Sequence, residues 1–512
     1  MLVLPLACGT RHPTRYQGAI RRLDSTRRSV WHMTKVHPFW VSGQAVTSDV
    51  VAHVTHPGDG STVGSYYVPT AAQVEQAIAA AAAVRYEFQA TSAAVRSDAL
   101  MHISQQLASR QEEIAQLITA ENGKPIIWAR SEASRAIATF RWAAEEARRF
   151  SGEVQRLDTE VSATGRYALI RRFPHGVVLG ISPFNFPLNL VAHKVAPAIA
   201  VGAPIIVKPA PSTPLSALLL GEIMAETNLP AGSWSVLPVD NSAAPALVAD
   251  ERLPVISFTG SDKVGFEIQK AVPHKHITLE LGGNAAALIL DDWSSDADLE
   301  WAATRVTLFG TYQAGQSCIS VQRIYAHESL FDKFAAKVIS AAEKLVNGDP
   351  FDDKTIVGPM INEAAAIRVE TWVNEAVAAG AKLLTGGKRD GSFYEPTVLT
   401  NVPKDAKVSC NEIFGPVMIL DSIRSTQEGF DLVNDSPFGL QAGVFTHNIQ
   451  TAFRAHRELE VGGVIIGDVP TFRSDQMPYG GVKASGVGKE GLRWAMEDMT
   501  HERIMVLSGL DL

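Results

Sequence analysis

Short apolar, β-branched runs alternate with stretches of helical periodicity along most of the chain. A first series comprises "GVVLGIS", "APIIVKPA", "GSWSVLP", "LPVISFTG" and "HITLELGG", and a second comprises "SVQRIYAH", "AKLLTGG", "GPVMILDSI", "QAGVFTH" and "VGGVIIGD". Strands that alternate with helices form parallel sheets covered on both faces. The sequence therefore predicts an α/β protein with two α/β domains in succession.

Alanine-rich amphipathic stretches precede the first series. Their periodicity predicts helices over about 71–89, 92–119 and 125–150, the first opened by Thr70 as its N-cap. With 512 residues, 46% of them hydrophobic, the chain is long enough for two or three domains around a large core.

Composition argues against several classes of protein. The three cysteines, Cys8, Cys318 and Cys410, have no CxxC spacing, so we expect neither a disulfide framework nor a metal site, and a reducing compartment such as the cytoplasm fits best. The net charge of −8 gives no basic field for nucleic acid. No apolar run reaches the roughly 18 residues that a membrane helix needs.

Residues 1–32 differ from the rest of the chain. "RHPTRYQGAIRRLDSTRR" is rich in arginine, whereas "MLVLPLAC" is too short for a secretory signal and lacks its leading positive charge. A transit segment is one interpretation. The other is that Met33 is the natural start and that the preceding residues are translated upstream sequence. In both cases we expect residues 1–32 to be a disordered or non-native extension.

Four polar residues stand where such a fold binds ligands, and each also has a structural interpretation. Asn185 in "ISPFNFPLNL" and Glu280 in "TLELGGN" follow or end apolar strands, but an asparagine often serves only a turn. A carboxylate at Glu280 must be paired or have a raised pKa. Cys318 in "YQAGQSCIS" is either a core cysteine or a nucleophile. "VISFTGSDKVG" places Ser261 in a strand-to-helix turn that suits a pyrophosphate or merely closes a βα unit.

Taken together, these stretches resemble the aldehyde dehydrogenase superfamily. The resemblance extends from about residue 36 to 506 and is carried by "SPFNFP", "VKPAPSTP", "FTGSDKVG", "LELGGN", "GQSC", "NEIFGP", "FGLQAGVFT" and "MPYGGVKASGVGKEG", in this order. It implies a Rossmann-type cofactor domain, an α/β catalytic domain and a small β bridging element. The resemblance therefore favours Cys318 as a nucleophile over Cys318 as a core residue.

The resemblance also implies a mechanism. Cys318 would attack the aldehyde carbon as a thiolate, and the Asn185 amide with the Cys318 backbone N–H would hold the oxyanion. After hydride transfer, Glu280 would activate the water that hydrolyses the thioester to a carboxylic acid. Alternatives left open are a coenzyme A-acylating dehydrogenase, which commonly lacks a carboxylate at Glu280, and a catalytically idle relative used for binding or structure.

Cofactor contacts follow from the same resemblance. The cofactor, NAD or NADP, would be bound by Ile181, Ser182, Pro183, Phe184, Lys208, Gly260, Ser261, Val264, Glu412 and Phe414. Pro211 stands three residues after Lys208, where NAD-preferring members often have a glutamate. A carboxylate there binds the ribose hydroxyls and repels a 2′-phosphate, and proline does neither.

Two arginines match positions at which relatives that oxidise anionic aldehydes bind substrate. Arg135 falls on a predicted helix and Arg473 in the loop before the glycine-rich tail. Together they would hold a carboxylate, phosphate or phosphonate, as in succinic semialdehyde, although each could instead be structural. Small hydroxyaldehydes such as lactaldehyde are further candidates, since Ser317 before the nucleophile is small.

The resemblance divides the chain into three further parts. We expect a cofactor domain over 33–155 and 176–281, a catalytic domain over 282–490, and a bridging element over 156–175 and 491–512. "SATGRYALIRRFPHG" has the alternation of an edge hairpin, and an exposed β edge is normally covered by a partner. A homodimer or homotetramer is therefore expected.

Overall fold

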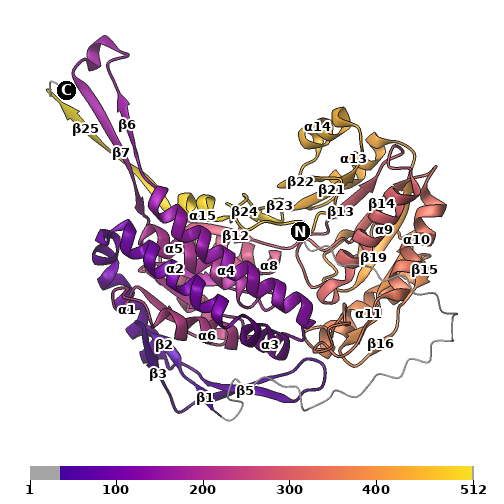
Figure 1. The fold of residues 1–512 in the computed structure, drawn as a ribbon, viewed down its shortest axis with the longest axis horizontal. Coiled ribbons are helices and arrows are strands. Elements are labelled where there is room, and N and C mark those ends of the chain that lie inside the picture. The colour runs from indigo at the N-terminus through magenta and orange to yellow at the C-terminus, as the bar shows by residue number, and fades with distance from the viewer. Residues whose placement is uncertain (1–34, 510–512) are drawn as a thin grey trace.

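Two large sheets, each with a parallel centre, form the two halves of the body in the computed structural model, which describes residues 35–509 (Figure 1). The predicted α/β class is thus confirmed, whereas the predictions for residues 1–32 lie outside the described residues. The first sheet has the order β24 (Gly486–Val487), β12 (His276–Glu280), β11 (Val255–Thr259), β8 (Val178–Ile181), β9 (Ile205–Lys208), β10 (Trp234–Val236), β2 (Phe39–Val41) and β3 (Gln44–Val46). The second has the order β15 (Lys382–Thr385), β18 (Thr397–Thr400), β19 (Val417–Ile423), β14 (Arg323–His327), β13 (Ala286–Ile289), β21 (Gln441–Phe445) and β22 (Gly463–Ile466).

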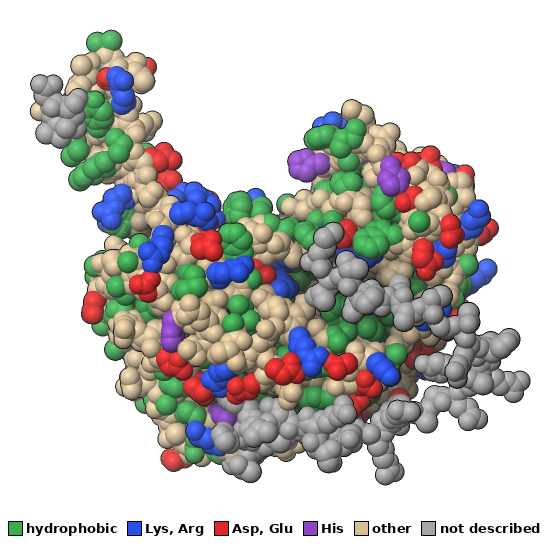
Figure 2. All heavy atoms as spheres, viewed as in Figure 1, with side chains coloured by type: hydrophobic (Ala, Val, Ile, Leu, Met, Phe, Trp, Pro, Cys, Tyr) green, Lys and Arg blue, Asp and Glu red, His purple; other side chains and the backbone are tan. Residues whose placement is uncertain are grey.

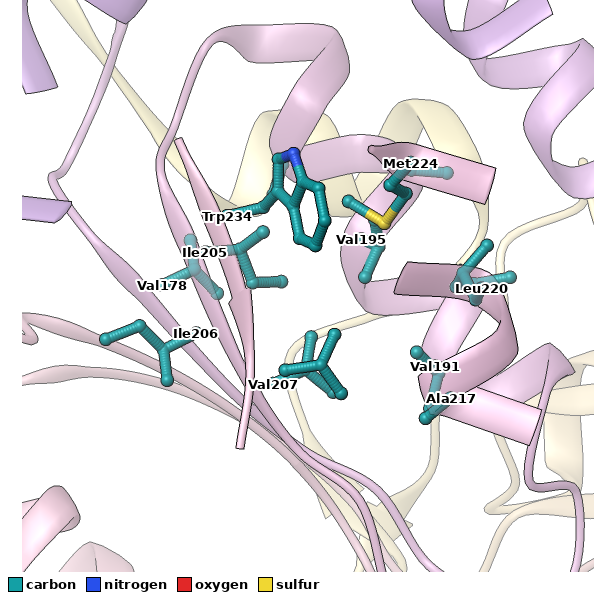
Figure 3. Packing of buried hydrophobic residues seen from close by; sticks show 14 of the residues in the cluster. Val178, Val191, Val195, Ile205, Ile206, Val207, Ala217, Leu220, Met224 and Trp234 are labelled. Atoms are coloured by element: carbon teal, nitrogen blue, oxygen red, sulfur yellow. The ribbon is translucent and has the colours of Figure 1, made fainter. Parts of the chain in front are cut away.

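Helices cover these sheets because the periodic segments place their apolar faces on the strands. The longer helices are α1 (Ala71–Ala90), α2 (Ala93–Ser109), α3 (Gln111–Asn122), α4 (Ile126–Arg149), α5 (Asn189–Val201), α6 (Leu215–Met224), α8 (Asp262–Ala271), α9 (Asp296–Thr311), α10 (Phe331–Lys344), α11 (Glu363–Ala378), α13 (Thr426–Asn434) and α14 (Ile449–Glu458). Short helices α7 (Ala244–Ala249), α12 (Lys407–Cys410) and α15 (Leu492–Asp498) complete the set. Figure 3 shows Val191 and Val195 of α5 and Leu220 of α6 on the side of β9 to which Ile205 and Val207 point, whereas Ile206 points to the other side.

Two details of the sequence prediction were wrong. The helix expected over 92–119 is broken at Arg110, whose φ of −110° and ψ of 18° are not helical. The Arg110 guanidinium forms ion pairs with Glu113 and Glu222. Strands β13 and β18 were not foreseen. "AALI" in β13 is rich in alanine and leucine, which have weaker strand preference than β-branched residues, so periodicity alone did not separate it from helix.

A three-stranded antiparallel sheet of β6 (Glu153–Arg156), β7 (Arg166–Pro174) and β25 (Thr500–Ser508) projects from the body as an arm (Figure 1). Hydrophobic side chains gather along it in Figure 2, and Val154, Ile504 and Met505 are exposed. The subunit pairing expected for this segment stays a prediction, as do the domain boundaries. Among residues 35–509, no helix combines the length and the apolar character needed to cross a bilayer.

A buried ion pair fixes the segment that carries Asn185. Glu132 of α4 accepts N–H groups from Leu188 (3.0 Å) and Asn189 (3.1 Å) at the beginning of α5, and its other oxygen binds the ammonium of Lys124. Neither charged side chain has access to solvent. Because the N–H groups that begin a helix have no partner within the helix, this carboxylate satisfies donors that would otherwise be orphaned.

Replacing Glu132 by alanine should lower the free energy of unfolding by about 3–5 kcal/mol, because it leaves the Lys124 charge buried without a partner. Urea denaturation measures the change. Glu112→Ala is the matched control, since Glu112 pairs with Arg130 at the surface and should cost less than about 1 kcal/mol. Equal stability losses in the two variants would contradict a special role for Glu132.

Candidate active site

A cavity of about 530 Å³ lies where segments from both sheets meet. It brings together eleven of the residues singled out in the sequence, namely Arg135, Pro183, Phe184, Asn185, Gly260, Ser261, Glu280, Cys318, Glu412, Phe414 and Arg473. Ile181, Ser182, Lys208 and Val264 do not line it. Ile181 ends β8 and Lys208 ends β9, so both lie at the carboxyl ends of adjacent parallel strands, the edge at which such sheets bind ligands.

Cys318 lies in the cavity with its sulfur 3.0 Å from the hydroxyl oxygen of Tyr479. Burial raises the pKa of Cys318 to about 11, and the hydrogen bond with Tyr479 opposes that rise. The thiol is therefore protonated at neutral pH in this state. The expected thiolate requires further stabilisation.

A left-handed turn presents Cys318 to the cavity. Gln313, Ala314 and Gly315 follow one another with φ of 52°, 53° and 68°, a conformation that costs energy for residues other than glycine. A Cβ atom on Gly315 would lie 2.0 Å from the carbonyl oxygen of Gly415, so only glycine fits there. The turn replaces further helix after α9 and directs the chain toward Cys318.

Asn185 is tied to this turn. Its side-chain amide donates to the carbonyl oxygen of Gln316 at 3.0 Å, and its backbone carbonyl accepts a hydrogen bond from the Gln313 side chain. The amide group is buried but lines the cavity that contains Cys318. Its second N–H is the donor that could face a reacting oxygen.

Glu280 ends β12 with its carboxyl group buried, and neither carboxyl oxygen has a hydrogen-bond partner. Burial raises the pKa of Glu280 well above its usual range, and the nearby charge of Glu490 raises it further. Of the two outcomes expected for this residue, its burial without a charged hydrogen-bond partner favours a raised pKa. Gly480 adjoins the group, since a Cβ there would lie 3.2 Å from Glu280 Oε1.

The part of the cavity lined by Phe184, Ser261, Glu412 and Phe414 has the features of a dinucleotide site. Phe184 and Phe414 meet edge to face at 5.9 Å, and Ser261 caps the beginning of α8 within the strand-to-helix turn that the sequence predicted. Outside the cavity lining, directly after β8, the Ser182 hydroxyl is buried without a hydrogen-bond partner. Burial raises the pKa of Glu412 to about 8, and its Oε1 accepts the Gly283 N–H at 3.0 Å. These polar and aromatic groups fit the phosphates, ribose and base of NAD or NADP.

Both candidate substrate arginines face the cavity, and each is held by a buried carboxylate. Arg135 donates to Asp475 from Nε (3.2 Å) and Nη2 (2.7 Å). Arg473 donates from Nη2 to Glu490 at 2.9 Å. Burial would raise the pKa of Asp475, but Arg135 and His193 bring it well below its usual range. Arg135 is thus salt-bridged, and its side chain is only partly exposed.

Sequence reasoning missed Tyr479, Glu490 and Asp475 as members of this site. All three lie in or beside the glycine-rich tail "MPYGGVKASGVGKEG". Glu490 also accepts from Lys194 Nζ at 3.4 Å, and Lys194 and Arg473 bring the pKa of Glu490 to about 2 although burial would raise it. Lys483, within this tail, forms an ion pair with Glu460 and does not line the cavity.

Comparisons with known proteins agree with this geometry. The sequence profile of the aldehyde dehydrogenase family matches residues 40–505. A 3-sulfolactaldehyde dehydrogenase of Priestia aryabhattai is 43% identical over 476 residues, which cover 93% of this chain and 98% of that protein.

Solved structures show the same relationship. Aldehyde dehydrogenase 21 of Physcomitrella patens, in complex with the reaction product succinate, is 43% identical with a TM-score of 0.91, covering 93% of this chain and 99% of that one. An NADP-dependent glyceraldehyde-3-phosphate dehydrogenase of Bacillus halodurans, complexed with NADP, is 32% identical with a TM-score of 0.88 and covers 93% and 99%. The chain therefore belongs to the aldehyde dehydrogenase family and is an NAD(P)-dependent oxidoreductase.

Proposed function

We propose that this enzyme oxidises a small anionic aldehyde to the carboxylic acid through a cysteine thiohemiacetal and thioester. The observation that carries the proposal is one cavity lined by a thiol, an unpaired buried carboxyl group, an amide and two arginines: Cys318, Glu280, Asn185, Arg135 and Arg473. A nucleophile, a base, an oxyanion donor and an anion site are the parts that this reaction requires.

Cys318 attacks the aldehyde carbon, because a thiolate is the most nucleophilic side chain near neutral pH. The negative charge that develops on the carbonyl oxygen meets the Asn185 amide, which its bond to Gln316 holds in a fixed orientation. When bound, NAD or NADP supplies the hydride acceptor. Phe184, Phe414 and Glu412 would hold its nicotinamide riboside portion.

Glu280 acts in the second half of the reaction. A general base works best when its pKa is close to the operating pH, and burial moves the pKa of Glu280 upward in that direction. Its carboxylate takes a proton from the water that attacks the thioester, and the acid is released. Glu280 lines the cavity, and its two unpartnered carboxyl oxygens are free to accept a hydrogen bond from that water.

Similar proteins support an anionic substrate. The Priestia relative is named after a sulfonated aldehyde, and the Physcomitrella structure contains the dicarboxylate succinate. Arg135 and Arg473 give this chain the donors for such a group. Succinic semialdehyde, a sulfonated or phosphorylated aldehyde and, with less use of the arginines, lactaldehyde are the substrates to compare.

The variant Glu280→Gln should reduce one equivalent of cofactor per active site in a burst and then turn over very slowly, because it retains the nucleophile and lacks the deacylating base. Stopped-flow measurement of NAD(P)H formation tests this. Cys318→Ala should give no burst. Wild-type turnover in Glu280→Gln would contradict the base assignment, and turnover that requires coenzyme A would favour the acylating alternative.

Replacing Arg135 by alanine should lower kcat/KM for succinic semialdehyde by a factor equivalent to about 2–5 kcal/mol and leave hexanal unaffected, because only the anion loses a charged partner. Arg473→Ala should show the same difference between the two aldehydes, in addition to a loss common to both. Arg130→Ala, an exposed change on the same helix as Arg135, is the control. The double variant Arg135→Gln with Asp475→Asn removes both charges, so its loss cannot come from an orphaned carboxylate. Equal losses on both aldehydes would show that the arginines are structural.

NADP should be used with a kcat/KM within about tenfold of that for NAD, a gap of roughly 1.4 kcal/mol or less. Pro211 supplies no carboxylate against a 2′-phosphate, and the Lys208 ammonium nearby donates to Asn241 at 2.8 Å. Initial rates with the two cofactors measure the ratio. Pro211→Glu should shift it toward NAD, whereas Pro211→Ala should not. A thousandfold wild-type preference for NAD would overturn this expectation.

A further inference from the structure

We propose that Tyr479 is a further catalytic residue, whose phenol hydroxyl donates a hydrogen bond to the Cys318 sulfur and stabilises its thiolate. The proposal rests on the proposed role of Cys318 as nucleophile. Its basis is a direct contact: the Tyr479 hydroxyl oxygen and Cys318 Sγ are 3.0 Å apart.

The position of Tyr479 is fixed from several sides. Its backbone N–H donates to the Glu490 carbonyl at 2.9 Å, and Glu490 N–H donates back at 2.6 Å, which forms an isolated antiparallel bridge. Its ring is 3% exposed and packs with Ile319 and Leu440 beside Cys318. The hydroxyl is therefore held against the sulfur by packing and does not reach it from a mobile side chain.

Chemistry sets the direction of this hydrogen bond. Either group could donate while both are protonated, but a thiolate sulfur can only accept. Burial raises the pKa of Tyr479 well above its usual range, and the charges of Cys318 and Glu280 add to this effect. The phenol thus keeps its proton when the thiol ionises, and the contact becomes a charge-assisted hydrogen bond.

Arg473 strengthens the donor. Its guanidinium carbon lies 3.7 Å from the centroid of the Tyr479 ring, and its Nη2 donates to Glu490 at 2.9 Å. A cation over an aromatic face withdraws electron density from the ring, so the O–H becomes a better donor. Arg473 therefore has a second contact that is independent of any substrate anion.

Tyr479→Phe retains the ring and removes only the hydroxyl, so the Cys318 pKa should rise by about 1–2 pH units. At pH values below both pKa values the thiolate fraction then falls about 10- to 100-fold. Because a more basic thiolate is also more nucleophilic, the net rate of thiol reaction should fall about 3- to 10-fold.

The test is alkylation of Cys318 by iodoacetamide in the cofactor-free enzyme over a range of pH, followed by peptide mass spectrometry. Cys410 in the same digest serves as an internal reference, because its sulfur lies outside the cavity near the Asp405 carbonyl. Tyr312→Phe is the matched control, a buried phenol that lines the same cavity. It should leave Cys318 alkylation within about twofold of wild type, an effect smaller than that of one hydrogen bond to a charged group.

Alkylation of Cys318 at the wild-type rate in Tyr479→Phe at every pH would overturn the proposal, as would an equal loss in Tyr312→Phe. The burst rate with aldehyde should fall in parallel with alkylation, while the burst amplitude stays at one equivalent. Failure of the proposed function has a different signature: selective alkylation of Cys318 would leave aldehyde oxidation intact, whatever the result with Tyr479→Phe.

Discussion

Buried carboxylates that must be neutralised determine how this site is built. Glu132, Asp475 and Glu490 are almost fully withdrawn from water, and each accepts from at least one buried or half-buried cation: Lys124, Arg135, Lys194 or Arg473. Removing either partner of such a pair leaves an uncompensated charge in a poorly polarisable interior. Of these four cations, Arg135 and Arg473 line the cavity, where an arriving anion would meet them.

Glu280 stands apart from that network. It is the one carboxyl group of the set without a hydrogen-bond partner among the described residues, and it faces Glu490. Burial would destabilise a carboxylate with only a structural role, but at Glu280 it raises the pKa and makes the carboxylate a stronger base. The pKa values of these neighbouring acidic residues therefore shift in opposite directions. Lys194 and Arg473 lower the pKa of Glu490 although burial would raise it, whereas burial and the charge of Glu490 raise the pKa of Glu280.

The sequence was most informative where function depends on strand ends. Asn185, Glu280 and Ser261 each follow or end a predicted strand, and parallel strands present their carboxyl ends at one edge, so the proximity of these residues follows from the order of the elements alone. The contact between Tyr479 and Cys318 does not. It depends on how an irregular segment from about 467 to 491 folds back, and no periodicity encodes that path. Similarly, no change in periodicity marks the break at Arg110, where the backbone leaves the helical conformation.

The left-handed turn before Cys318 has a mechanical consequence. Gln313 binds the Asn185 backbone, the Gln316 carbonyl accepts from the Asn185 side chain, and the Gln316 side chain accepts the Ile361 N–H at 2.9 Å. Nucleophile and amide therefore belong to one cross-linked unit although about 130 residues separate them in the sequence. If the two halves of the molecule shift relative to each other, the distance between the Cys318 sulfur and the Asn185 side-chain amide should change little.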